Sequence, residues 1–163
     1  MNLIARHFRR YTERKPWDFC WKIGVESTVA SFISAILLML VIGVTGRDFL
    51  DMPLPDVFIL LILAAPPVET LVFQAFPIFI VRILKGSMRT QILVSTLLFS
   101  AAHFPEGINT GVSAGVVGGL YFAFAYAHWR KKSRWKSFWI TTVCHVIHNG
   151  ICFVLLVVSG NWS

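Results

Sequence analysis

The chain has 163 residues, of which 56% are hydrophobic and only 14% are charged. Because a soluble domain carries about 25% charged residues, this composition indicates a membrane protein of one domain. The net charge of +7 does not indicate nucleic-acid binding, since the basic residues lie in clusters between apolar runs. We attribute the basic excess to membrane topology and to contact of the basic loops with anionic lipids in the bilayer.

The N-terminal segment 1–22 is basic, and residues 23–163 are expected to form the membrane-embedded domain. The segment mixes six Lys and Arg residues with Leu, Ile, Phe, Tyr and Trp. It fits either an amphipathic helix on the membrane surface or a basic juxtamembrane tail. The apolar run that follows is longer than the roughly 7–15 residues of a cleavable signal sequence, so we expect a retained helix.

Five apolar runs predict about five transmembrane spans, and hence an all-α, polytopic helical bundle. The spans are expected at residues 24–45, 57–84, 90–104, 108–128 and 137–158. The third run covers only about 22 Å, which is short for a bilayer core of about 30 Å. The fourth run contains four glycines that would let another helix approach closely, within the chain or in a second copy, so the oligomeric state stays open.

Pro66 and Pro67 lie inside the second run. Proline lacks a backbone N–H and clashes with the preceding turn, so we expect the pair to break this helix into a lead-in and a main helix. Glu69 would then stand in the first turn of the main helix. A broken helix is tolerated in a membrane where neighbouring protein satisfies the freed backbone groups.

The basic residues predict the orientation of the chain. With five spans and a cytoplasmic N-terminus, fourteen of the fifteen Lys and Arg residues lie in the inner segments 1–22, 82–89 and 130–136, and only Arg47 lies outside. The positive-inside rule therefore selects a cytoplasmic N-terminus and an outer C-terminus.

Few strongly polar side chains lie deep within the spans: Glu69, Gln74, His103, His145, His148 and Asn149. Ionisable groups are costly in a membrane, so they usually face the bundle interior and serve a function. Counted from the inner helix ends, Glu69, His103 and Asn149 lie at depths of about 20–22 Å and His145 at about 14 Å, so these groups can share a layer. Glu26 lies near the start of the first span, where a helix N-terminus tolerates an acid, and is interpreted as interfacial.

One glutamate, two histidines and an asparagine suit hydrolysis of a peptide bond by activated water. The glutamate can take a proton from water that a histidine positions. A second histidine and the asparagine amide can donate to the oxyanion that forms. Two alternatives stay open: a His/His/Glu zinc site, which is weaker because HExxH is absent, and interhelical hydrogen bonding without catalysis.

Three segments together resemble the motifs of one protein family: VETLVFQ (68–74), FSAAH (99–103) and HVIHN (145–149). The CAAX protease and bacteriocin-processing family, also called the abortive-infection family, has EExxxR, FxxxH and HxxxN or HxxxD motifs in this order. The resemblance implies a glutamate-dependent intramembrane endopeptidase without a cofactor. Glu69 matches the base and His103 its partner, while His145 and Asn149 match the oxyanion hole. Phe99 opens the second motif, and His148 is expected to support the site.

Two positions depart from the family motif. Thr70 replaces its second glutamate and Gln74 replaces its arginine. Because they are four residues apart, we expect a neutral hydrogen-bonded link in place of an ion pair, with catalysis retained. The departure motivates one alternative, a non-catalytic scaffold or immunity protein. A proton-coupled transporter is a third hypothesis, which the lack of a visible inverted repeat disfavours.

The resemblance covers about residues 60–155. Together with the small size, it implies a protein of the prokaryotic inner membrane that acts on a peptide or a membrane protein. Nothing in the sequence identifies that substrate or marks recognition of a prenyl group.

Overall fold

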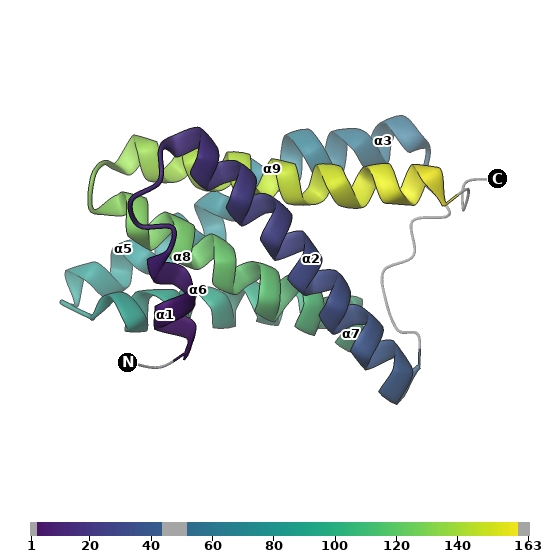
Figure 1. The fold of residues 1–163 in the computed structure, drawn as a ribbon, viewed down its shortest axis with the longest axis horizontal. Helices are drawn as coiled ribbons and strands as arrows, with labels where there is room; N and C mark the ends of the chain where they lie inside the picture. Colours follow the sequence, from purple (N-terminus) through teal and green to yellow (C-terminus); the bar gives the residue numbers. More distant parts are fainter. Residues whose placement is uncertain (1–2, 44–51, 160–163) are drawn as a thin grey trace.

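The structure, a computed structural model, describes residues 3–43 and 52–159, and within these ranges every regular element is a helix (Figure 1). A short helix, α1 (Leu3–Arg9), comes first. Five helical passes follow: α2 (Pro16–Ile42), the run α3 to α5 (Leu54–Ile83), α6 (Met88–His103), the run α7 to α8 (Ile108–Arg130) and α9 (Arg134–Val158). The predicted all-α bundle is confirmed.

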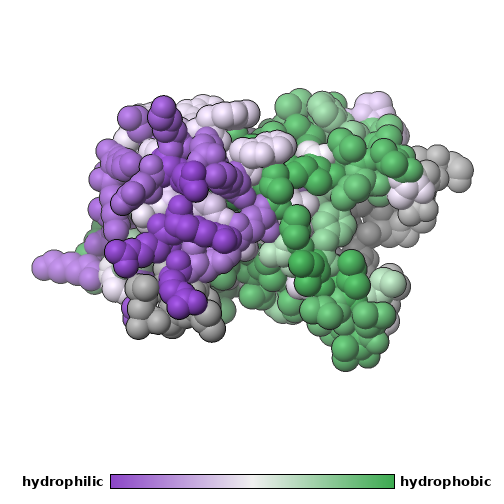
Figure 2. Space-filling model, viewed as in Figure 1, coloured by the Kyte–Doolittle hydropathy of each residue, from purple (hydrophilic) through white to green (hydrophobic). Residues whose placement is uncertain are grey.

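The surface of these helices is largely apolar. Four passes of the described chain, all except α6, are long and apolar enough to cross a membrane. The remaining pass, α6, has only 16 residues, as its short apolar run predicted. Figure 2 shows apolar residues covering the part of the visible face away from the hydrophilic end, and side chains such as Leu40 and Val41 are 75% and 81% exposed. Such a surface is stable only in lipid, so the chain is an integral membrane protein.

The first pass begins earlier than the apolar run suggested. Its helix starts at Pro16, because proline suits the first turn of a helix. Residues 16–22 therefore belong to α2, and Glu26 lies in its third turn instead of its first. Residues 44–45 of the predicted first span, and Arg47 in the following loop, lie outside the described residues.

The N-terminal helix α1 docks on protein. Phe8 and Tyr11 are 6% and 3% exposed, and the Phe8 ring stacks on that of Phe124 in α8 (Gly119–Arg130) at 4.2 Å between centroids. Phe8 and Tyr11 are thus covered by the bundle, whereas Trp17 and Trp21 of the same predicted segment are exposed.

Glu26 holds α1 in place. Its carboxylate lies 2.6 Å from Nε2 of His7 and also pairs with Arg10. The Tyr121 hydroxyl donates to the same carboxylate at 3.1 Å. These contacts join α1, α2 and α8, so the surroundings of Glu26 indicate a structural role.

The prediction that Pro66 and Pro67 break the helix is wrong. The helix continues from Leu54 to Ile83, through α3 (Leu54–Phe58), α4 (Ala65–Glu69) and α5 (Phe76–Ile83). Two π-helical segments, η1 (Ile59–Ala64) and η2 (Thr70–Ala75), flank α4. The prolines remove two backbone donors, and the wider π turn accommodates this loss without leaving the helical path. Glu69 therefore ends the short α4 segment.

The glycine-rich pass packs closely on α6, as predicted. The pass contains α7 (Ile108–Thr110), the π-helical η4 (Gly111–Gly118) and then α8. A Cβ atom on Gly115 would lie 2.9 Å from the Ser100 backbone, and one on Gly119 would lie 2.9 Å from the Phe99 ring. This approach sets the position of the end of α6, where Phe99 and His103 lie.

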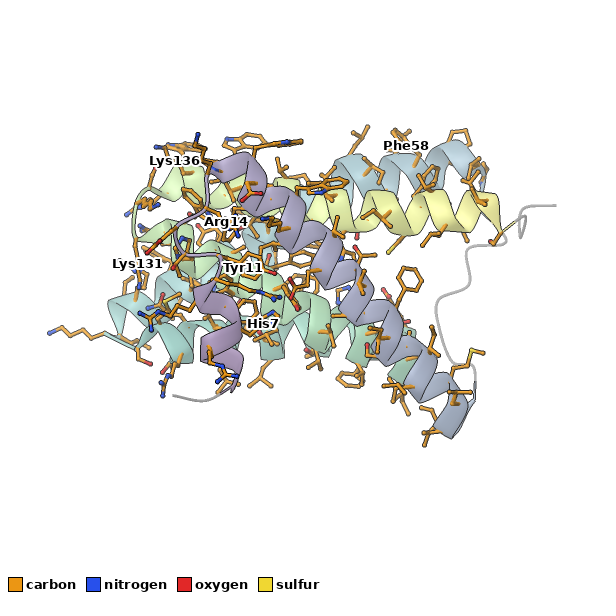
Figure 3. The ribbon with its side chains drawn as sticks, viewed as in Figure 1. His7, Tyr11, Arg14, Phe58, Lys131 and Lys136 are labelled. Carbon is orange, nitrogen blue, oxygen red and sulfur yellow. The ribbon has the colours of Figure 1, made fainter. Side chains whose placement is uncertain are left out.

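The bundle has a polar and an apolar end. Hydrophilic side chains gather at one end of the long axis (Figure 2), where Figure 3 places Arg14, Lys131 and Lys136, while Phe58 lies toward the other end. The described helices α1 and α9 end on opposite sides of the bundle (Figure 1).

Candidate active site

A cavity of about 290 Å³ lies between α4, α6, α9 and the glycine-rich pass. Its lining includes all four residues that the sequence singles out for catalysis, together with Phe99 and His148; the full set is Leu61, Ala65, Glu69, Phe99, His103, Glu106, Thr110, Ala114, Phe122, His145, His148, Asn149 and Cys152. Since one water occupies about 30 Å³ in the liquid, a cavity of this volume has room for several. Glu106 and Thr110 follow the C-terminal end of α6, so the cavity lies away from the basic loops.

Glu69 and His145 face each other across this cavity. Oε2 of Glu69 lies 3.5 Å from Nε2 of His145, and the two side chains are 21% and 4% exposed. The Phe122 ring stacks on the imidazole of His145 at 4.2 Å, and Phe99 meets its edge at 5.9 Å. The two phenyl rings fix the orientation of His145 and hold its Nε2 toward Glu69.

His103 has a defined tautomer. Its Nδ1 lies 2.8 Å from the carbonyl oxygen of Phe99, one turn earlier in α6. A carbonyl oxygen only accepts, so Nδ1 carries a hydrogen; when the ring is neutral, Nε2 carries the lone pair. Ser100 is turned away from this chemistry, because its hydroxyl donates to the carbonyl of Thr96 at 2.7 Å.

His148 is anchored to α2. Nδ1 of His148 forms a hydrogen bond of 2.9 Å with the Ser27 hydroxyl, which also lies 2.9 Å from the carbonyl oxygen of Gly24. His148 was expected to support the site, and its side chain lines the cavity itself.

Asn149 satisfies a carbonyl that the proline pair leaves open. In η1 the backbone N–H of Ala65 donates to the carbonyl oxygen of Leu60, five residues earlier. The same pattern would pair the carbonyl oxygen of Leu61 with an N–H of Pro66. Pro66 has no N–H, and Nδ2 of Asn149 donates to the Leu61 carbonyl at 2.8 Å. The amide has a second hydrogen for another acceptor. The prolines and Asn149 thus form one structural unit beside Glu69.

The predicted link between Thr70 and Gln74 is wrong. Both side chains are fully buried, and the Thr70 hydroxyl and both Gln74 amide atoms have no hydrogen-bond partner within the described residues. The two residues lie in η2, where π-helical winding moves positions four apart off a common face. Neither residue lines the cavity, so each affects it only through the packing of η2.

Several lining residues were not predicted. Glu106 is an acid three residues after His103, a spacing that places two side chains near each other at a helix end, so the sequence carried that signal. Phe122 carried none, since it is one aromatic among many. Cys152 also lines the cavity, four residues after His148.

The sequence left open a zinc site formed by two histidines and a glutamate. In the part of the chain that the structure describes, no three His, Cys, Asp or Glu side chains come together in a group that could hold a metal ion. Addition of a chelator to the reaction tests whether a metal takes part.

The family of the chain follows from its sequence. The model of the family described as type II CAAX prenyl endopeptidase Rce1-like matches residues 51–151, well over half of the chain. The chain belongs to this family, which confirms the resemblance to CAAX proteases. The matched region contains Glu69, His103, His145 and Asn149. Neither a curated protein nor a solved structure matches the chain.

Proposed function

We propose that this protein is an intramembrane endopeptidase that hydrolyses a peptide bond in or near the bilayer with a water molecule activated by Glu69. The observation that carries this proposal is the single cavity that gathers Glu69, three histidines and Asn149 within the region matched by the family model. The family indicates the class of reaction, and the cavity supports the assignment of roles.

Glu69 acts as the base in this proposal. A water in the cavity gives a proton to the Glu69 carboxylate while its oxygen forms a bond to the scissile carbonyl carbon. His103 presents Nε2 with its lone pair, which accepts the other hydrogen of the water and orients it. When the carbon–nitrogen bond breaks, Glu69 returns the proton to the leaving amine, so the carboxylate is regenerated.

His145 and Asn149 stabilise the oxyanion. Nε2 of His145 lies at the cavity, 3.5 Å from Oε2 of Glu69, and the second amide hydrogen of Asn149 is not needed by Leu61. Donors that are fixed before the reaction stabilise the developing charge most effectively. Phe122 and the Leu61 carbonyl fix these two donors.

The replacement of the family ion pair by Thr70 and Gln74 is compatible with this mechanism, because neither residue reaches the cavity. It also supports the alternative of a non-catalytic scaffold or immunity protein, since buried polar atoms without partners destabilise η2.

We place the protein in the prokaryotic inner membrane with a cytoplasmic N-terminus and an outer C-terminus. The gathering of the basic loops at one end of the bundle supports this orientation (Figure 2). The substrate is a peptide or a membrane protein. A C-terminal reporter that is active on only one side of the membrane tests the orientation.

The test of the function is cleavage in liposomes. Wild type and Glu69→Gln are incubated with a library of membrane peptides, with and without a chelator, and fragments are identified by mass spectrometry. We expect fragments from the wild type alone, unaffected by chelation. Fragments from both proteins would overturn the role of Glu69, and sensitivity to the chelator would move the same side chains to a metal site.

A further inference from the structure

A second hollow lies outside the candidate active site, on the surface that faces lipid. It is a groove of about 560 Å³ between the run from η2 to α5 and the ends of α8 and α9, lined by Leu71, Val72, Ala75, Phe76, Phe79, Tyr126, Arg130 and Arg134. It shares no lining residue with the first cavity. Its volume is in the range of small-molecule sites, which is about 300–1,000 Å³.

The wall of this groove is apolar and accessible. Leu71, Phe76 and Phe79 are 58%, 63% and 42% exposed, so their side chains face the surrounding lipid and not the protein core. A groove with such a wall is open along its side to the hydrocarbon region. It suits a flexible alkyl chain that lies along α5.

One end of the groove is cationic. Arg130 and Arg134 belong to the lining, and Arg82 lies close enough to Arg130 to repel it electrostatically. None of these three arginines forms a salt bridge with an acid among the described residues. The Arg134 guanidinium lies 6.0 Å from the centroid of the Phe79 ring, which holds it over the groove. Three guanidinium charges this close together repel one another, and a bound anion would relieve the repulsion.

We propose that this groove binds one anionic phospholipid, with an acyl chain against Leu71, Val72 and Phe76 and the phosphate between Arg130 and Arg134. An apolar groove that ends in arginines is complementary to this ligand, since guanidinium groups bind phosphate in a bidentate manner. Bulk attraction to anionic lipid would involve the whole basic loop equally, whereas this site depends on two of its residues.

The test uses the delipidated full-length protein in detergent. Retention of phosphatidylglycerol is compared with that of phosphatidylcholine with the same acyl chains, by native mass spectrometry. The wild type is expected to retain one phosphatidylglycerol, and the pair Arg130→Gln/Arg134→Gln to lose about tenfold in its affinity. Lys131→Gln/Lys132→Gln is the matched control, because it removes the same charge from exposed neighbours outside the groove, and it is expected to bind as the wild type does.

A second variant tests the apolar part. Val72→Trp fills the groove and keeps every charge, so it is expected to weaken retention of phosphatidylglycerol about tenfold while the thermal midpoint stays near that of the wild type. Wild-type retention by Val72→Trp, equal losses in the two double variants, or equal retention of the two lipids would each overturn the proposal. So would a soluble peptide whose free C-terminal carboxylate binds the wild type but not the arginine variant, since the arginines would then serve a substrate.

Discussion

Two glutamates lie in the apolar helices of this bundle, and their surroundings differ. Glu26 in α2 is met by His7, Arg10 and the Tyr121 hydroxyl, which leaves it as the centre of a closed cluster. Glu69 in α4 faces a cavity of about 290 Å³ that three imidazoles share. An acid that is paired with cations stabilises the fold, whereas an acid beside a cavity with room for water can exchange protons with that water.

The two acids also differ in the side chains that surround them. The Glu26 cluster joins α1 to the bundle and lies at the basic end, where arginine is abundant. The Glu69 cavity has no arginine or lysine in its lining, and its histidines are each fixed by a backbone group, a hydroxyl or aromatic rings. The difference predicts that substitutions at the cavity change activity, and that substitutions at the Glu26 cluster change stability.

The largest effect among the histidines is expected at His103. Replacement by alanine removes the Nε2 acceptor that positions the water, so the cleavage rate should fall by about 10²–10⁴-fold, while the thermal midpoint changes little. His7→Ala is the control from the Glu26 cluster and should retain the cleavage rate. Loss of cleavage in both variants would erase the distinction between the two regions.

Asn149 is expected to contribute to both activity and stability. Asn149→Ala should lower the cleavage rate by about 10²–10³-fold through loss of an oxyanion donor. It should also lower stability by about 1 kcal/mol, because the Leu61 carbonyl loses its hydrogen bond.

The two roles of Asn149 can be separated. Adding Pro66→Ala to Asn149→Ala supplies an N–H near the Leu61 carbonyl, so thermal stability should recover while cleavage stays impaired. Recovery of cleavage in the double variant would show that Asn149 acts only on the helix.

A moderate effect on stability is expected at Glu26. Glu26→Gln removes the ion pairs with His7 and Arg10, which should cost about 1 kcal/mol, or about 2–4 °C in thermal midpoint. Amide hydrogen exchange in α1 should accelerate as this helix detaches. Glu13→Gln makes the same change of charge at an exposed position, and an equal shift there would refute a specific role for the cluster.

The smallest effect on activity is expected at Gln74. Gln74→Met replaces a buried amide that has no partner among the described residues by an apolar side chain of similar shape, so the thermal midpoint should stay constant or rise, with cleavage within about twofold of wild type. A marked fall in the midpoint would show that Gln74 is satisfied by water or lipid and is part of a polar network.

The sequence predicted the parts of this molecule that depend on local composition and on spacing along a helix. Long apolar runs located the five passes, and the four-residue interval between His145 and Asn149 placed both on one side of α9. Glu69 and His103 were selected because charged groups inside a membrane are costly. These inferences need no knowledge of how the helices pack.

The features that were missed depend on tertiary contacts. The π-helical segments around Pro66 and Pro67 keep the helix continuous because Asn149, from a distant pass, satisfies the Leu61 carbonyl. The same winding separates Thr70 from Gln74, which the interval alone had joined. Docking of α1 depends on Phe8 packing against α8 and Tyr11 packing against Phe19 of α2, which no local pattern specifies.

The central claim is that Glu69, and not Glu26, performs chemistry. The most direct test measures, in liposomes, the rate at which wild type, Glu69→Gln and Glu26→Gln cleave one peptide identified from the library, with thermal midpoints recorded for each protein. We predict that Glu69→Gln loses at least about 10³-fold in rate with its fold intact, and that Glu26→Gln cleaves within about twofold of wild type at a lower thermal midpoint. Wild-type cleavage by Glu69→Gln, or an equal loss of rate in both variants, would contradict the account.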